Sequence, residues 1–225
     1  MPDDERLANR AASMPALIGG RLCLDFANTV EPRMAAQPDA ARDYLTSYAD
    51  LIGWSVHAGI VSEQAARQLL SEAQRHPTAA RDTLTGALLL REAVYRVFRA
   101  VAQHTSPAQP DLDTLSQARR AAIAHAAIVR APDGFRWTWA DDPRALDRVV
   151  WPIADSAVLL LTEGQHERIK VCPGVPGDPA ACAWLFYDSS KNRTRRWCSM
   201  EDCGSATKAR QQTARRRSLR AQHGG

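Results

Sequence analysis

Four of the five cysteines of this 225-residue chain lie near its C-terminal end, and their spacing is the feature most able to do chemistry. They form two pairs in the pattern Cys-x9-Cys-x15-Cys-x4-Cys. Two pairs with a spacer of this size are the arrangement that a tetrahedral four-thiolate zinc site needs. The sequence therefore predicts a structural Zn²⁺ ion, and its predicted ligands are Cys172, Cys182, Cys198 and Cys203.

The same residues have two simpler interpretations, namely ordinary buried thiols or disulfides formed among them. The surrounding segment is short and highly charged, so it has little apolar surface with which to fold. A bound metal would supply the missing folding free energy. This favours zinc, and redox chemistry of the same thiols stays open.

The residues between the cysteines predict how the thiolates are positioned. The Pro- and Gly-rich stretch PGVPGDPAA is expected to be a loop, while AWLFYD (183–188) and NRTRRW (192–197) are expected to be the two strands of a hairpin. Ser199 occupies a good N-cap position, followed by acidic residues in the first turn of a helix. A knuckle, a hairpin and a helix in this order predict a treble-clef-like finger.

A concentration of positive charge accompanies this finger. Residues 189–220 contain ten basic and two acidic residues, a net charge of +8, whereas the rest of the chain has 19 basic and 23 acidic residues, a net charge of −4. A basic end on an acidic body predicts a polyanion partner. Such a run alone would more often be a solubilising tail, but its attachment to a metal-held helix favours double-stranded DNA. The predicted DNA-binding residues are Lys191, Arg193, Arg195, Arg196, Lys208, Arg210, Arg215, Arg216 and Arg217.

The longer N-terminal part predicts a mainly helical unit with a small antiparallel sheet, so that the fold class of the chain is α+β. A short strand is expected at 21–24, a loop at 106–113 and a hairpin with arms at 128–130 and 135–139. Helices are expected to end at Gly59, to begin after Ser62 and at Pro77, to run from about 112, and to end at Gly164 with a kink at Pro152. Trp137, Trp139 and Trp151 are expected in the core. We place the domain boundary near Gln165, giving domains at 14–164 and 165–220.

Several classes of function lack support in the sequence. The first residues contain no apolar segment of a secretory signal, and no apolar run is long enough to cross a membrane, so a cytoplasmic protein is expected. No nucleophile elbow, P-loop or dinucleotide-binding motif is present. We therefore expect that the chain is not an enzyme.

The finger segment resembles the CGNR zinc finger found at the C-terminus of bacterial stress-induced transcription regulators. The matching pieces are Cys-Pro at 172–173, C-x-WLF-x-D, S-x-NR-x-RRWCSM, and Cys-Gly at 203–204 followed by KARQ. The opening GGRLCLDFANTV (19–30) is similar to the start of the ABATE domain that precedes such fingers, and WPIADSAVLLLT fits its last helix. The resemblance implies a DNA-binding finger whose metal ligands are the four cysteines named above.

Two features qualify what the resemblance implies. The tetrapeptide that names the family reads Cys-Gly-Ser-Ala here, because Ser205 and Ala206 replace Asn and Arg. Asp25, Asn28 and Thr29 resemble the polar trio of the ABATE opening. Such residues most often cap a helix or fix a turn, and a pocket for a small-molecule effector is the sharper alternative.

The expected function is that of a zinc-dependent, DNA-binding transcriptional regulator that responds to stress or to a ligand and could act as a homodimer. The alternative is a ligand-binding or protein- or RNA-interaction module whose zinc finger is structural and does not read DNA.

Overall fold

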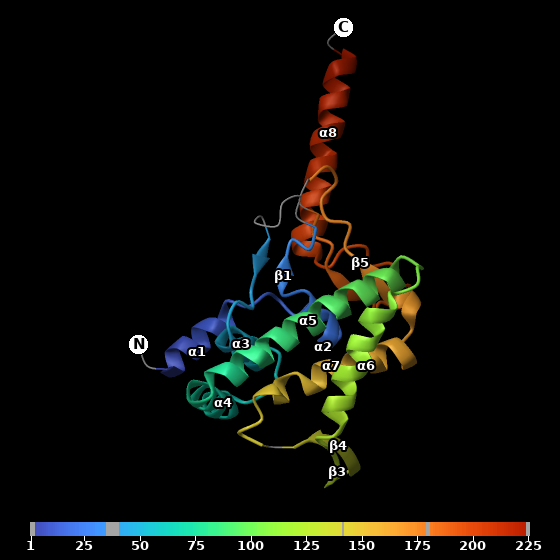
Figure 1. Cartoon of the computed structure of the whole chain (residues 1–225). Coiled ribbons are helices and arrows are strands. Elements are labelled where there is room, and N and C mark those ends of the chain that lie inside the picture. Colours follow the sequence, from blue (N-terminus) through green and yellow to red (C-terminus); the bar gives the residue numbers. More distant parts are fainter. Residues whose placement is uncertain (1–2, 35–40, 141, 179–180, 224–225) are drawn as a thin grey trace.

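The computed structural model describes residues 3–34, 41–140, 142–178 and 181–223, and it describes side-chain surroundings for residues 5–216 within these ranges. The described chain is mainly helical and contains three two-stranded antiparallel ladders. This confirms the predicted α+β class. Figure 1 shows the helices gathered into one body, from which the C-terminal helix α8 projects. No helix within the described ranges is long and apolar enough to span a membrane.

Most predicted helices are present, and α4 begins after Ser62 as predicted. Ser47 caps α3 and Ser62 caps α4 by accepting hydrogen bonds from the backbone N–H groups of Asp50 and Ala65. The proline that starts α5 lies in its first turn, where its missing N–H costs no hydrogen bond. The N-terminal helices are α1 (Asp3–Ala12), α2 (Leu22–Ala27), α3 (Tyr48–His57), α4 (Glu63–Arg75) and α5 (Pro77–Ala102).

Two further helices complete the body. Helix α6 (Gln109–Ile123) begins inside the predicted loop at 106–113, because Pro110 occupies its first turn and favours helix initiation. The predicted amphipathic helix is divided by Pro152 into a 3₁₀ turn, Leu146–Val149, and α7 (Trp151–Glu163). Helices α5, α6 and α7 pack in sequence, and their buried residues form much of the core.

The predicted strand at 21–24 is wrong, since these residues lead into the short helix α2. Cys23, Leu24, Phe26 and Ala27 are all buried. A helix that is buried on every side has no polar face, so its short apolar run has no helical period and resembles a strand. Asp25 therefore lies within the helix.

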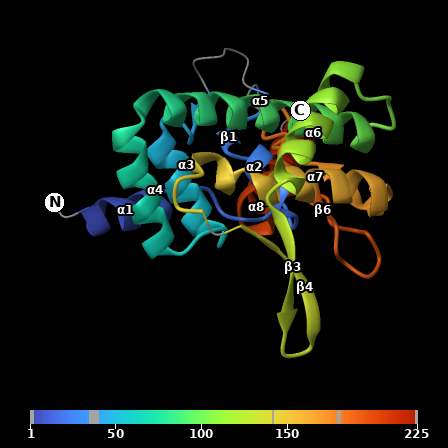
Figure 2. The same cartoon turned by 60° about the horizontal axis from the view of Figure 1, so that its bottom comes forward.

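The hairpin is present as β3 (Ala126–Ala131) and β4 (Gly134–Trp139). It extends from the body, as Figure 2 shows. Trp151 and Trp139 pack in or against the core as expected, but the core position predicted for Trp137 is wrong, because this side chain is 53% exposed. The strand alternates aromatic and polar residues whether or not another layer covers it, so the pattern could not reveal that the hairpin projects.

The remaining two ladders are short. Strand β1 (Val30–Glu31) pairs with β2 (Arg42–Asp43), and β5 (Ile169–Val171) pairs with β6 (Leu185–Tyr187). The prediction of a second finger strand at 192–197 is wrong, because β6 pairs with the unpredicted β5 instead. The other C-terminal elements are a 3₁₀ turn, His166–Arg168, a π-helical turn, Met200–Gly204, and α8 (Ser205–His223).

The β5–β6 ladder belongs to the same core as the helices. Ile169, Leu185 and Tyr187 are buried in the main apolar cluster, while Cys172, Trp184, Phe186 and Cys198 are the buried residues of a smaller one. One face of this ladder thus supports the helical body, and the other supports the cysteines. The division of the chain into domains at Gln165 stays a prediction.

Candidate metal centre

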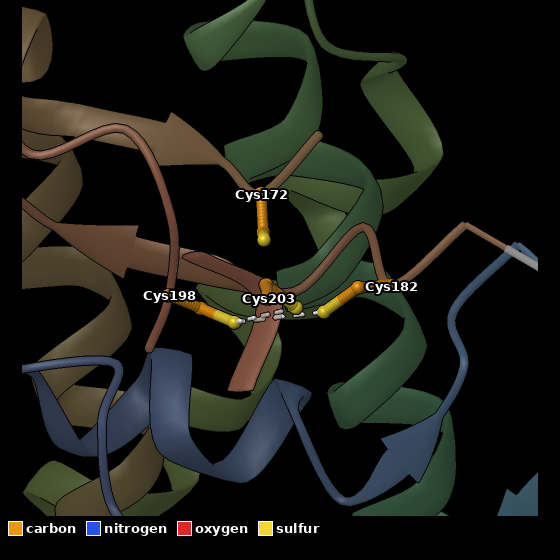
Figure 3. A group of neighbouring side chains, drawn as sticks. All are labelled: Cys172, Cys182, Cys198 and Cys203. Carbon is orange, nitrogen blue, oxygen red and sulfur yellow. Dashed lines mark hydrogen bonds between the residues drawn. The ribbon is translucent and has the colours of Figure 1, made fainter. Parts of the chain in front are cut away.

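The four predicted ligands meet at one point, although they come from separate parts of the C-terminal segment. Their sulfur atoms all lie within 4.8 Å of one another, and Figure 3 shows the side chains directed toward a common centre. The sulfurs of Cys182 and Cys198 are 3.6 Å apart, and those of Cys198 and Cys203 are 3.9 Å apart. A tetrahedron with Zn–S bonds of about 2.3 Å places its sulfurs about 3.8 Å apart. The cluster thus has the dimensions of a four-thiolate zinc site.

The β5–β6 ladder positions the first pair of cysteines. Cys172 directly follows β5, and its backbone N–H donates to the carbonyl of Trp184 at 2.8 Å. Gly174 then reverses the chain with a φ of +66°, and a Cβ atom there would lie 3.0 Å from the backbone nitrogen of Cys182. Only glycine adopts this turn at such close approach without strain. The long loop between Cys172 and Cys182 is therefore the connection of the β5–β6 hairpin.

The start of the C-terminal helix positions the second pair. Ser199 is the N-cap, as predicted, and its side chain accepts a hydrogen bond from the N–H of Asp202 at 3.1 Å. The π-helical turn that follows brings Cys203 back toward Cys198 before α8 begins. Thr207, in the first turns of α8, donates from its hydroxyl group to the carbonyl of Cys203 at 2.7 Å. The metal cluster is therefore built into the base of α8.

The thiol groups influence one another strongly. Hydrogen bonds from Cys182 and Cys198 lower the pKa of the Cys172 thiol. The hydrogen bonds to Cys172 raise the pKa values of Cys182 and Cys198, and burial raises that of Cys203. Four thiolates packed this closely need a cation to compensate their charge. A zinc ion with four thiolates would leave a formal charge of about −2.

Arg195 is the cation built into this region, and it braces the backbone next to the cluster. Its guanidinium group stacks on the ring of Phe186, 4.6 Å from the ring centre. It donates to the carbonyl oxygens of Trp197, Ile18 and Cys198. The side chain thus joins the finger to the segment before α2, and its donors are directed into the protein.

A buried ion pair organises the loop that was expected to be a strand. Lys170 donates to the carboxylate of Asp188 at 2.6 Å and to the carbonyls of Arg193 and Arg195. The same carboxylate accepts from the backbone N–H groups of Ser190 and Arg195. Burial raises the pKa of Asp188, but the hydrogen bonds from Lys170 and Ser190 outweigh it and lower the pKa to about 2. Side-chain contacts therefore fix residues 189–195 where no strand partner is available.

The N-terminal body forms part of the wall around the cysteines. The amide of Asn28 makes two hydrogen bonds with the backbone of Leu185, donating at 2.8 Å and accepting at 2.9 Å. The backbone N–H of Arg33 donates to the carbonyl of Cys182 at 3.0 Å, and the indole of Trp184 donates to the carbonyl of Val30. These contacts tie residues 28–33 to the segment that carries a metal ligand.

The trio Asp25, Asn28 and Thr29 thus lies inside the protein, where the end of α2 contacts β6. All three residues are buried, and Asn28 is only 1% exposed. The carboxylate of Asp25 accepts from the N–H of Gly19 at 2.7 Å, and the hydroxyl of Thr29 donates to the carbonyl of Phe26 at 2.8 Å. Because these polar groups are used by the backbone, we propose no effector pocket at the trio.

The predicted DNA-binding residues have different surroundings. Arg195 is half-buried, the side chain of Arg217 lies outside the described residues, and Arg193 forms a 3.0 Å ion pair with Glu167. The exposed members of the set are Lys191, Arg193, Arg196, Lys208, Arg210, Arg215 and Arg216. Ser205 and Ala206 are also exposed, at the start of α8.

The functions of Lys170, Asp188 and Arg33 could not be recognised from the sequence. Only the fold shows that Asp188 is buried and that Lys170 bonds to backbone carbonyls. It also shows that the guanidinium of Arg33 donates to the carbonyl of Ala27 and pairs with Glu92. The one available signal was the aspartate at the end of the strand-like stretch AWLFYD, which is a frequent place for a residue that fixes a turn.

Comparison with known families agrees with this architecture. Residues 20–164 match the ABATE family, which is described as "putative stress-induced transcription regulator". Residues 168–216 match the CGNR zinc finger. The chain therefore belongs to the ABATE family and carries a CGNR zinc finger, which confirms both resemblances. No curated protein matches the chain.

Proposed function

We propose that this protein is a zinc-dependent, DNA-binding transcription regulator. The observation that carries the proposal is a four-cysteine cluster at the base of a projecting helix with basic side chains. The helix α8 has 19 residues, and Glu201 and Asp202 lie in the turn that precedes it. The family description supports a regulatory role.

The exposure of α8 favours a polyanion as its partner. Every residue from Lys208 to Arg216 is exposed, so this stretch has no face packed on the body. A helix with polar residues on every side gains little free energy by packing against the body. The like charges along such a helix also repel one another. Phosphates on both sides of a DNA groove would neutralise these charges and release counterions.

Zinc has a structural role in this proposal. The ion would be held by Cys172, Cys182, Cys198 and Cys203, and its binding free energy would contribute to the folding of the finger. The chain's own residues then orient α8, through the N-cap at Ser199 and the bond from Thr207 to Cys203. The ion itself performs no reaction. We propose accordingly that the protein is not an enzyme.

The salt dependence of DNA binding tests the proposal. The full-length zinc-loaded protein is used to select fragments of genomic DNA, and the affinity for a selected fragment is measured as the salt concentration changes. Lys208→Ala and Arg216→Ala should each make the slope of log K against log salt less steep by about one. Arg120→Ala, which removes an exposed arginine from α6, should leave the slope unchanged. If the zinc-loaded protein selects no DNA and retains an RNA or a protein instead, the alternative function is correct.

A further inference from the structure

A cleft in the helical body lies outside the metal centre and outside α8. It is formed where α1 packs near α3 and α4, next to the start of α5, and these elements gather at one end of the body in Figure 2. Its volume is about 680 Å³. Small-molecule sites in proteins typically have volumes of roughly 300–1,000 Å³. The cleft is thus large enough for a metabolite.

The interior of the cleft is apolar. Leu7, Tyr48 and Ala80 are buried residues that line it, and Leu70 and Leu84 are half-buried there. The hydroxyl of Tyr48 is turned to the core, where it donates to the carbonyl of Leu146 at 2.9 Å, so its ring presents carbon atoms to the cleft wall. Such walls favour an aliphatic chain or an apolar ring over a sugar or a free amino acid.

The charged residues of the cleft all have the same sign. Four arginines line it, namely Arg6, Arg10, Arg67 and Arg81, and no acidic residue is among the described side chains that do so. Arg10 pairs with Asp50, and Arg67 lies 3.9 Å from Glu63. Arg6 and Arg81 are exposed, and among the described side chains neither guanidinium group forms an ion pair. The cleft therefore presents excess positive charge.

This charge contrasts with the rest of the body. Outside residues 189–220 the chain has a net charge of −4. The cleft has the opposite character, because four arginines and no acidic residue are among the described side chains that line it. Arginine is well suited to a carboxylate because two of its N–H groups match the two oxygens.

We propose that this cleft binds a small amphipathic carboxylate, with its apolar chain between α1, α4 and α5 and its carboxylate among the arginines. The site is separate from DNA binding, so this proposal does not depend on the proposed function. The site is distinct from the trio Asp25, Asn28 and Thr29, and α1, which precedes the residues that match ABATE, forms one of its walls.

Calorimetry on the full-length zinc-loaded protein tests the proposal with three probes of the same chain length. Octanoate carries the predicted charge, octanol is neutral and octylammonium is positive. Octanoate should bind at least about tenfold more tightly than either of the others, since a charge-assisted hydrogen bond from arginine contributes at least this factor. Equal affinity for octanol, or no binding of octanoate, would overturn the proposal.

Variants then locate the binding site. The double substitution Arg6→Ala and Arg81→Ala changes exposed side chains only, so the variant should fold with an unchanged Tm. Its affinity for octanoate should fall at least about tenfold. Arg120→Ala, in which an exposed arginine is removed from α6, should bind octanoate within about twofold of wild type. An unchanged affinity in the double variant would show that the carboxylate binds elsewhere and would contradict the proposal.

Discussion

Arg195 and Arg196 are adjacent in sequence, but their side chains have different surroundings. Arg195 donates to three carbonyl oxygens and stacks on Phe186, whereas Arg196 is exposed and contacts the ring of Trp197 at 5.3 Å. The first therefore supports the metal centre, and the second is available to a partner. The two positions form a natural matched pair for mutation.

We expect Arg195→Ala to lower the Tm of the zinc-loaded protein and to speed the loss of zinc to a chelator, because it leaves three carbonyl groups without a donor. Loss of charge-assisted hydrogen bonds of this kind costs roughly 2–3 kcal/mol. Arg196→Ala should leave the Tm and zinc release unchanged and should weaken DNA binding. Thermal unfolding and chelator competition measure both effects, and equal zinc release in the two variants would contradict the assignment.

Asp25 is the second residue whose surroundings have a measurable consequence. Burial raises its pKa from 3.8 to about 6, although the N–H of Gly19 and the charge of Arg195 act in the opposite direction. A carboxyl group with a raised pKa is easier to protonate in the folded protein than in the unfolded chain. Its contribution to stability is therefore complete below pH 4 and is lost as the pH rises toward 6.

Asp25→Asn should remove this pH dependence, because the amide oxygen can still accept from Gly19 and carries no charge. The difference between the free energies of unfolding, variant minus wild type, should increase by at most about 3 kcal/mol as the pH rises from 4 to 6. At higher pH this difference should level off. Denaturant titrations across this pH range provide the measurement. A difference that stays constant with pH would show that Asp25 has no raised pKa.

Among the secondary-structure elements, β6 is the one that connects the two parts of the chain. It pairs with β5 on one side, and the amide of Asn28 bonds to its Leu185 on the other. A buried side chain thus replaces a third strand. This contact joins β6, close to Cys182, to the C-terminal end of α2.

Asn28→Ala should destabilise the zinc-loaded protein by roughly 3 kcal/mol, since it leaves a buried N–H and a buried C=O of Leu185 without partners. Asn192→Ala changes an exposed asparagine of the finger segment and should have an effect below about 0.5 kcal/mol. Urea unfolding compares the two. Equal stability of both variants would mean that Asn28 does not join the body to the finger.

The start of α8 carries the departure from the CGNR tetrapeptide. Ala206 is exposed there, so an arginine could be accommodated without a clash with the core. We expect Ala206→Arg to strengthen DNA binding and to make the salt slope steeper by about one. An Ala206→Gln variant, which adds length without charge, should leave the slope unchanged. If the two variants have the same slope, position 206 does not face phosphate.

The sequence could predict the elements whose signals are local. The helix start after Ser62 and the N-cap at Ser199 were recognisable, and the two cysteine pairs indicated a common site without any knowledge of the fold. The β5–β6 pairing could not be predicted, because three-residue strands separated by a 13-residue connection have no recognisable period. The same limit applies to α2 and to the exposure of Trp137, since both depend on what the rest of the chain places around them.

At the scale of the whole molecule, the metal cluster lies between a helical body and a free helix. The body contacts the cluster through residues 18–33, and α8 begins at Ser205, directly after the turn that carries Cys203. Loss of the metal should therefore affect both sides, by releasing the base of α8 and by loosening β6. We therefore expect DNA binding and zinc occupancy to change together.

The most direct test is DNA binding by the full-length protein before metal removal, after it and after zinc is restored, with zinc content measured at each stage. We expect one zinc per chain in the binding protein, loss of DNA affinity when zinc is removed, and recovery when zinc is added back. Cys198→Ser should resemble the metal-free protein, and Cys23→Ser, which changes the buried cysteine outside the cluster, should retain its zinc. DNA affinity that persists after complete removal of zinc would contradict the central claim.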